Sequence, residues 1–198
     1  MNEQMKINVG VIFGGRSVEH EVSIISAHQA MAAMNKDKYR AIPIYISKEG
    51  QWYSGEALLD LNAFKNMPKL LKEAIPIEIS ANYGQKEIFT RESGLFKKPW
   101  SEHLDVVLPV VHGTSVEDGC LQGLLETAGI PYAGPAVLGS AVGMDKIMMK
   151  AVLREAGLPV VDYRAYALYQ WQDDEEEVLA EIEKAFGYPL IIKPANLG

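Results

Sequence analysis

The sequence is nearly free of cysteine. Cys120 is the single cysteine among 198 residues, which excludes an internal disulfide and any metal site built from several thiolates. Chains without disulfides are typical of reducing compartments, so we expect a cytoplasmic protein. Residues 1–6 are polar and the apolar run at 7–13 is too short for a signal peptide, so we expect none.

Long hydrophobic runs and an excess of positive charge are also missing. No apolar stretch approaches the roughly 20 residues that cross a bilayer as a helix, so we expect no membrane association. The 26 acidic residues outnumber the 19 basic ones, which gives a net charge of −7 and a pI of about 5.2. This balance excludes a large basic surface for nucleic acid. An anionic substrate such as ATP would have to be bound by local lysines and a divalent cation.

The first pattern that is present is strand, helix, strand. Residues 7–13 and 41–46 are short apolar runs rich in branched side chains, which are typical of buried strands. Ser17 is placed to cap a helix between them. The apolar residues of that helix recur at helical spacing, at Ile24, Ala27, Met31 and Met34. This order predicts a right-handed crossover and an α/β fold with a mostly parallel sheet.

Residues 47–103 predict an antiparallel extension or insertion. Glycine and asparagine punctuate this stretch; its candidate strands lie at 51–53, 75–79 and 87–90, with a helical piece at 57–64. A central strand is predicted at 104–111. The helix that follows at 120–128 is closed by Gly129 as its C-cap.

A second domain is predicted to begin near residue 141, so that the chain divides into residues 1–140 and 141–198. A short helix at 136–142 leads into it. Beyond this helix we predict a helix from Asp145, a strand at 160–167, a helix at 173–186 and a strand at 188–193. The two helices carry apolar stripes, at Ile147, Met148, Ala151 and Val152 and at Val178, Leu179, Ile182 and Phe186. The chain stops in a loop, and we expect that it is cut rather than finished.

The first candidate site follows the first strand. Gly14 and Gly15 stand where backbone N–H groups usually face a phosphate. The dinucleotide fingerprint G-x-G-x-x-G is incomplete, because Glu19 occupies the place of the third glycine, and this disfavours an NAD(P) dehydrogenase. Glu19 and Glu21 fall at a helix N-terminus, where carboxylates stay ionised. They either complement the helix dipole or hold a cation such as a substrate ammonium.

Two further sites contain a histidine and two lysines. His112 follows the central strand, at the edge where open α/β sheets bind ligands, and Gly113 forms the turn after it. A lone histidine is either a structural residue or a functional one, and this position favours neither alone. Lys146 lies in the first turn of a helix, where the dipole disfavours a cation, and Lys193 ends an apolar strand. Each lysine either points into solvent or binds an anion; together they suggest a nucleotide clamp.

Four motifs carry a resemblance to a known family. They are GGRSVEHEVS at 14–23, HGTSVEDGCLQG at 112–123, GSAVGMDK at 139–146 and IIKPANLG at 191–198. In this order the chain resembles the D-alanine–D-alanine ligases, which are ATP-grasp enzymes of peptidoglycan synthesis. The resemblance implies a Rossmann-like (pre-ATP-grasp) N-terminal domain followed by the first, incomplete part of an ATP-grasp α+β domain. It also implies a homodimer formed through the first domain.

The resemblance assigns roles to individual residues. Glu19 matches the acid that holds the amino group of the first D-alanine, and His112 matches the histidine near the carboxylate of that substrate. Both count as catalytic, and they share the substrate site with Gly14, Gly15, Ser17 and Gly113. Lys146 and Lys193 match the two lysines that bind the phosphates of ATP. The Mg²⁺ or Mn²⁺ ligands are expected beyond residue 198, so no metal ligand is expected in this chain.

The implied reaction joins two D-alanines through an acyl phosphate at the expense of ATP, and the 198-residue piece alone is expected to be inactive. Two alternatives stay open: a ligase that adds D-lactate or D-serine, and a non-catalytic module that binds an amino acid or a nucleotide. The histidine loop departs from the family pattern H-G-x-x-G-E-D-G, because Val116 stands at its second glycine. If that position requires a positive φ, valine is expected to be strained there.

Overall fold

The computed structural model describes residues 5–90 and 100–197. Contacts between Cα atoms divide them into two compact units, the first ending at Ala141 and the second spanning Val142–Leu197. Each is described by itself below, as unit 1 and unit 2.

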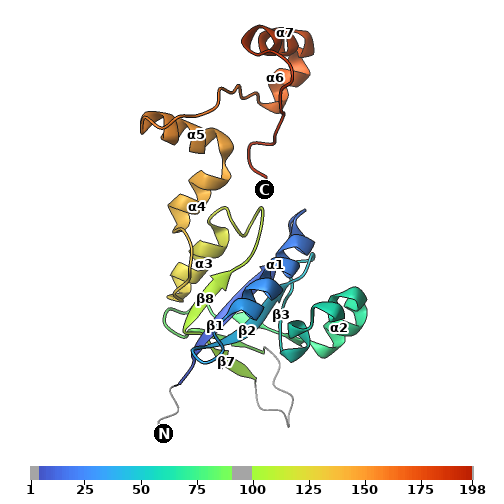
Figure 1. The fold of residues 1–198 in the computed structure, drawn as a ribbon, viewed down its shortest axis with the longest axis vertical. Helices are drawn as coiled ribbons and strands as arrows, with labels where there is room; N and C mark the ends of the chain where they lie inside the picture. The colour runs from blue at the N-terminus through green and yellow to red at the C-terminus, as the bar shows by residue number, and fades with distance from the viewer. Residues whose placement is uncertain (1–4, 91–99, 198) are drawn as a thin grey trace. The chain divides into compact units, whose positions relative to one another are not determined.

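Unit 1 is built on a five-stranded sheet in the order β4-β3-β2-β1-β8 (Figure 1). Strand β1 (Ile7–Gly14) lies in the middle and runs parallel to β2 (Tyr39–Ile46) and to β8 (Val106–Pro109). Strands β3 (Trp52–Ser54) and β4 (Ile75–Pro76) continue the sheet in antiparallel order beyond β2. The predicted α/β fold with a mostly parallel sheet and an antiparallel extension is therefore confirmed.

The region between β3 and β8 is more divided than the sequence predicts. The single strand expected at 75–79 is two strands in different sheets, because β5 (Glu78–Ile79) pairs with β6 (Glu87–Phe89), which pairs with β7 (Ser101–His103). The helical piece expected at 57–64 consists of two 3-10 helices, η1 (Glu56–Leu59) and η2 (Leu61–Asn66). Helix α2 (Met67–Glu73) follows them and was missed, because Pro68 suggests a break although it stands in the first turn, where proline is favourable.

Helices cover both faces of the larger sheet. On one face α1 (His20–Ala33) buries Ile24, Ala27 and Met31 against Val9, Val11 and Phe13 of β1. On the other face α3 (Cys120–Ala128) buries Leu121 and Leu125 against Ile12, Ile44 and Val107. Alternate residues of β1 thus serve two cores, as the period of two in a strand requires. Both faces are apolar because the parallel strands are covered on each side.

Helix α1 begins two residues later than predicted. The Oγ atom of Ser17 accepts a hydrogen bond from the Glu19 N–H at 3.0 Å, and the helix starts at His20. Ser17 therefore closes a turn before the helix instead of capping it. In contrast, α3 has its predicted bounds, and Gly129 adopts the left-handed conformation (φ 68°) of a C-cap.

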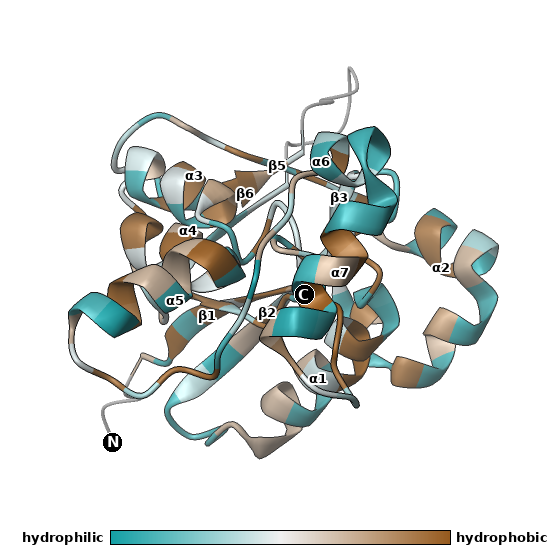
Figure 2. Ribbon diagram, turned by 90° about the horizontal axis from the view of Figure 1, so that it is seen from above, coloured by the Kyte–Doolittle hydropathy of each residue, from teal (hydrophilic) through white to brown (hydrophobic). Residues whose placement is uncertain are grey.

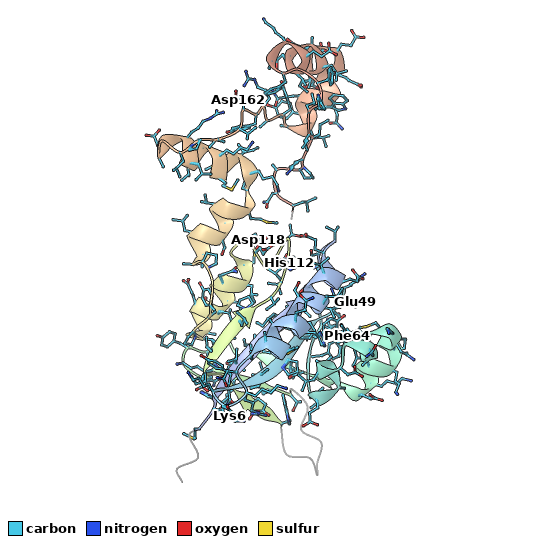
Figure 3. The ribbon with its side chains drawn as sticks, in the orientation of Figure 1. Lys6, Glu49, Phe64, His112, Asp118 and Asp162 are labelled. Atoms are coloured by element: carbon cyan, nitrogen blue, oxygen red, sulfur yellow. The ribbon has the colours of Figure 1, made fainter. Side chains whose placement is uncertain are left out.

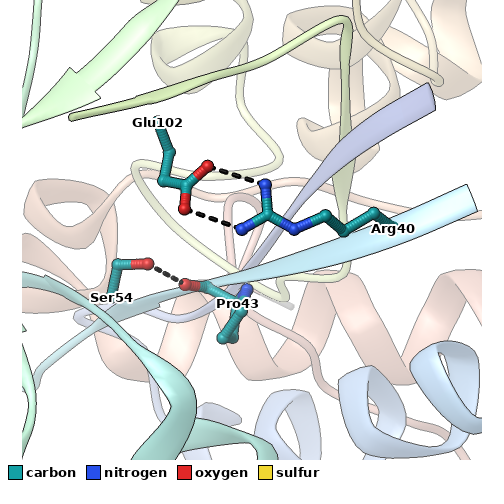
Figure 4. A network of polar contacts seen from close by, with 4 residues as sticks. All are labelled: Arg40, Pro43, Ser54 and Glu102. Carbon is teal, nitrogen blue, oxygen red and sulfur yellow. Dashed lines mark hydrogen bonds and ion pairs between the residues drawn. The ribbon is translucent and has the colours of Figure 1, made fainter. Parts of the chain in front are cut away.

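A bidentate ion pair fastens the two sheets of unit 1 together. Both Nη atoms of Arg40, at the start of β2, donate to the two Oε atoms of Glu102 in β7 at 2.7 Å (Figure 4). Below it in the same figure, the Oγ of Ser54 donates to the carbonyl oxygen of Pro43 at 2.7 Å. Arg40 lowers the pKa of Glu102 below its ordinary value.

The stability that this pair contributes should depend on pH. A carboxyl whose pKa is lowered by folding stabilises the fold above its unfolded-state pKa, about 4.3 for glutamate, and loses that contribution as pH falls through the lowered value. Since both side chains are partly exposed, we expect about 1 kcal/mol at pH 7. Urea unfolding of the wild type and of Glu102→Gln should differ by that amount at pH 7 and converge below pH 4. An undiminished difference at pH 3 would contradict the assignment.

Unit 2 consists of helices joined by irregular segments. It takes in the end of α4 (Val137–Met144), then α5 (Lys146–Glu155), α6 (Leu168–Asp173) and α7 (Glu175–Ala185). The helix start predicted at Asp145 is confirmed, since its Oδ1 accepts hydrogen bonds from the N–H groups of Ile147 and Met148 at 2.9 Å. The helix predicted at 173–186 instead begins after Asp174, whose side chain caps α7.

The two strands predicted in unit 2 are wrong. Residues 160–167 and 188–193 join no strand ladder in the structure, and α6 begins directly after the first of these segments, at Leu168. A strand needs hydrogen-bonding partners beside it, and the part of unit 2 that the structure describes offers no other strand. Ile191 and Ile192 are accordingly 82% and 86% exposed.

The apolar stripe predicted on α5 is present but not buried. Hydrophobic residues alternate with hydrophilic ones along this helix (Figure 2). Met148 and Val152 are both about half exposed, and no residue of α5 is buried. In α7, by contrast, Val178 of the predicted stripe is buried, whereas Leu179 remains exposed. Within the described residues, no helix is long and apolar enough to cross a bilayer.

Candidate functional site

Two loops meet at the carboxyl ends of neighbouring parallel strands in unit 1. Residues 15–19 follow β1 and residues 110–119 follow β8, which pairs directly with β1. Figure 3 shows His112 and Asp118 at this end of the sheet and Lys6 at the other. This edge is where open α/β sheets bind their ligands.

The glycine pair is not built to hold a phosphate. The Gly14 N–H donates to the Oγ of Ser23 at 2.8 Å, and the Gly15 N–H donates to the carbonyl oxygen of Ile46 at 2.8 Å. Both N–H groups are therefore used inside the protein. Gly14 is required for another reason, since its φ is 89° and a Cβ there would lie 2.2 Å from the Ile46 oxygen.

Ser23 joins the two loops through one hydroxyl. Its Oγ accepts from the Gly14 N–H and donates to the carbonyl oxygen of Val110 at 2.5 Å, and the side chain is fully buried. Sequence analysis missed this residue. It lies four residues before Ala27, on the buried side of α1, and a serine at such a position signals a polar contact with the sheet.

Removing this hydroxyl should weaken the whole edge of the sheet. Ser23→Ala removes the partner of the buried Gly14 N–H and of the partly buried Val110 oxygen, so we expect a loss of about 2 kcal/mol in the free energy of unfolding. Urea unfolding measures it. The control is Ser26→Ala on the same helix, whose side chain is only partly buried and which should change the value by less than about 0.5 kcal/mol.

Glu19 and the histidine loop are brought together. A Cβ placed on Gly113 would lie 2.4 Å from the Oγ of Ser17 and 4.0 Å from the Oε2 of Glu19. Gly113 is buried, whereas Ser17 and Glu19 are partly buried. The absence of a side chain at Gly113 is what allows the two loops to approach this closely.

The two acids at the start of α1 have different surroundings. Lys48 forms an ion pair with Glu21 at 2.5 Å, and this hydrogen bond lowers the pKa of Glu21. No cation pairs with Glu19 among the residues that the structure describes. Of the two carboxylates, Glu19 is thus the one left available for a cationic ligand.

The histidine loop is shaped by the acids that follow it. The Gly113 N–H donates to Oε2 of Glu117 and the Ser115 N–H donates to Oδ2 of Asp118, both at 2.7 Å. Burial by itself raises the pKa of Asp118, but the N–H donors of Ser115 and Cys120 outweigh it, so the pKa lies below the usual value. The Nε2 of His112 is buried and has no hydrogen-bond partner in the described structure.

The strain expected at Val116 is absent. The positive φ of this loop falls on Ser115 (67°), one residue earlier, and Val116 is not among the described residues with positive φ. Val116 is 3% exposed, and one of its methyl groups would be 3.4 Å from a Cβ on Gly15. The valine therefore fills the space behind the glycine pair without backbone strain.

Sequence analysis also missed His20. This residue is 3% exposed; its Nδ1 lies 2.7 Å from the Gly15 carbonyl oxygen and its Nε2 lies 3.0 Å from the Tyr45 hydroxyl. The carbonyl can only accept, so Nδ1–H donates to it. Burial raises the pKa of Tyr45, which keeps the phenol protonated. Its spacing could have identified it as buried, since His20 precedes Ile24 by one helical turn and so lies on the buried face of α1.

The two lysine motifs meet within unit 2. The Lys146 N–H donates to the carbonyl oxygen of Ala195 at 2.9 Å, and its Nζ donates to that of Leu197 at 2.5 Å. Since Asp145 takes the next two N–H groups of α5, an anion here would depend on ammonium groups and not on the helix backbone. Lys193 is exposed. Among the described residues, no cluster of three or more His, Cys, Asp or Glu is placed to hold a metal ion.

Two models of a known protein family match the chain. A family model described as the N-terminus of D-Ala–D-Ala ligase matches residues 8–135, and the model of the C-terminus matches residues 152–198. The chain belongs to the D-alanine–D-alanine ligase family.

Curated members of the family show how much of a ligase the chain covers. The D-alanine–D-alanine ligase of Natranaerobius thermophilus is 42% identical over 195 residues, which are 98% of this chain and 51% of that protein. The ligase of Geobacillus kaustophilus is 43% identical over 195 residues, 98% of this chain and 52% of that protein. The chain thus spans about half the length of the ligases it matches.

Solved structures of the family have the same fold. The VanG D-Ala:D-Ser ligase of Enterococcus faecalis aligns with a TM-score of 0.75 at 35% identity, covering 98% of this chain and 53% of that one. The D-alanine–D-alanine ligase of Coxiella burnetii aligns with a TM-score of 0.75 at 35% identity, covering 92% and 50%.

Proposed function

We propose that an enzyme containing this chain ligates two D-alanines to D-alanyl-D-alanine at the expense of ATP, for peptidoglycan synthesis in the cytoplasm. The observation that carries the proposal is the Glu19 carboxylate, which no cation pairs with among the described residues and which faces Gly113 at the carboxyl edge of the sheet. The chain that carries this carboxylate belongs to the ligase family. We assign residues 1–140 to the substrate-binding domain and residues 141–198 to the start of the ATP-grasp domain.

Unit 1 would bind the first D-alanine. Glu19 accepts hydrogen bonds from the substrate ammonium, which is the cation that this carboxylate lacks. The buried Nε2 of His112, without a partner in the described structure, is available to the substrate carboxylate. Gly14 and Gly15 let the first loop pack against β2 and Val116, and Gly113 lets the histidine loop approach Ser17. Ser17 holds the turn that presents Glu19 to the substrate.

Unit 2 would bind ATP through Lys146 and Lys193. Their ammonium groups suit a polyphosphate, whose charge they offset by electrostatic attraction. ATP supplies the phosphoryl group that activates the first D-alanine as an acyl phosphate, and the amine of the second D-alanine displaces phosphate. The required Mg²⁺ or Mn²⁺ would be held outside the described residues, which offer no carboxylate cluster for it.

A D-alanine–D-serine ligase is the second candidate, since the 35% identical VanG structure is a D-Ala:D-Ser ligase. Glu19 and His112 serve the first substrate and so do not separate the two. Chromatographic analysis of the dipeptide formed by an enzyme containing this chain, offered D-alanine and D-serine together, decides between them.

The substrate site can be tested on the 198-residue chain itself. NMR titration with D-alanine should shift the amide resonances of Glu19 and Gly113, whereas L-alanine should have a much weaker effect. The chain alone should release no phosphate from ATP. Unchanged spectra with D-alanine at millimolar concentration would contradict the proposed site.

We also propose a homodimer formed through unit 1. Val18, Val22 and Ile25 form an exposed apolar stripe on and just before α1, being 81%, 52% and 49% exposed. Light scattering should give twice the monomer mass. Val22→Asp should reduce this mass, and a monomeric wild type would contradict the proposal.

A further inference from the structure

Gln122 of α3 is a buried polar residue that the proposed mechanism does not use. Its side chain is 5% exposed, and it packs beneath the histidine loop. Its Nε2 donates to the carbonyl oxygen of Val116 at 3.1 Å, while its Oε1 has no hydrogen-bond partner. Buried amides are normally satisfied at both ends.

The structure has two such atoms among its described residues, one in the histidine loop and one in the helix that follows it. They are the Oε1 of Gln122 and the Nε2 of His112. A buried polar atom without a partner is costly in a settled core, so such atoms concentrate where a ligand or water completes the network. The same loop carries Gly113, where an added Cβ would lie 2.4 Å from the Oγ of Ser17 and 4.0 Å from the Oε2 of Glu19.

The contacts of Gln122 reach the substrate site in two steps. Its amide fixes the carbonyl of Val116, and the Val116 side chain lies against Gly15, in the loop that leads to Glu19. Glu117, which is exposed, and Asp118, which is partly buried, bond to N–H groups within the histidine loop itself. From the protein interior, Ser23 holds the start of the loop at Val110, and Gln122 holds its middle at Val116.

We propose that Gln122 is a positioning residue for the first-substrate site. It holds the histidine loop against the Glu19 loop through Val116, so that His112 and Glu19 face one ligand. The inference rests on the proposed function, because it assumes that D-alanine binds between these loops. Gln122 itself does not touch the substrate.

The test is D-alanine binding by the 198-residue chain with Gln122→Met, which keeps the size of the side chain but removes the amide. We expect a five- to tenfold rise in Kd, in proportion to one lost hydrogen bond. The unfolding temperature should hardly change, because the substitution also removes the unpaired Oε1. Gln29→Met, on the exposed side of α1, is the matched control and should bind like the wild type.

Each outcome decides the matter. Weaker D-alanine binding by a variant of unchanged stability supports the inference. Wild-type affinity in Gln122→Met overturns the inference but leaves the proposed function standing. Absence of binding by the wild-type chain overturns the proposed function and the inference together. If Gln122→Met does not fold, the wild type decides: D-alanine should shift the side-chain amide resonances of Gln122 and leave those of Gln29 unchanged, and an unmoved Gln122 overturns the inference.

Discussion

Replacing Glu19 with glutamine should weaken D-alanine binding by about 10- to 100-fold, since a hydrogen bond to a charged group is worth roughly 1.5–3 kcal/mol. The amide keeps the size of the side chain, so the turn closed by Ser17 should persist. What is lost is the negative charge facing Gly113. NMR titration of the 198-residue chain with D-alanine measures the change in affinity.

The chain provides a matched control two residues away. Glu21→Gln makes the same chemical change at an exposed carboxylate that is already paired with Lys48. We expect its affinity for D-alanine to stay within about twofold of the wild type, because exposed ion pairs contribute little. Equal losses of affinity in both variants would mean that the electric field at the start of α1 governs binding, and not a specific contact of Glu19.

The substitution Gly14→Ala should destabilise unit 1 by at least about 3 kcal/mol, among the largest effects of a single methyl group. The new Cβ would lie 2.2 Å from the backbone oxygen of Ile46 and 2.9 Å from the ring of Tyr45, at a φ of 89°. A backbone atom of the neighbouring strand cannot move aside as a flexible side chain can. Urea unfolding of the variant should show the loss, or the chain should fail to fold.

The opposite result is expected for Gly123→Ala. Gly123 lies within α3, and a Cβ there would meet no atom within 4 Å beyond its chain neighbours and the backbone of its own helix. Alanine favours a helix over glycine by about 0.5–1 kcal/mol, so the free energy of unfolding should rise by that amount. A loss of stability in Gly123→Ala, or a neutral Gly14→Ala, would contradict the geometry described for these two glycines.

The parallel core of the fold could be predicted because its signals are local. Apolar runs identified β1 and β2, and the spacing of Ile24, Ala27 and Met31 identified α1. The strands of unit 2 could not be identified in the same way. The apolar run at 188–193 indicates only that its side chains favour burial. A strand also requires a neighbouring strand to pair with, and the described part of unit 2 has none.

The sequence could nominate residues for the candidate site but could not predict their contacts. Motifs pointed to Glu19, His112 and Gly113, and the roles given to them remain proposals. The distinction between Glu19 and Glu21 depends on Lys48, which lies 27 positions from Glu21 in the sequence, so no local pattern could reveal it. Ser23 and Gln122 were missed because buried polar residues on a helix look like ordinary surface positions until their partners are known.

The position of the left-handed residue in the histidine loop has a consequence for variation. Ser115 carries the positive φ, so residue 116 has the backbone freedom of any ordinary residue. A substitution there therefore changes the packing behind the glycine pair and not the backbone conformation of the turn. For the proposed substrate site, a change of side-chain volume at position 116 would act through the packing behind Gly15 and leave Glu19 and His112 untouched.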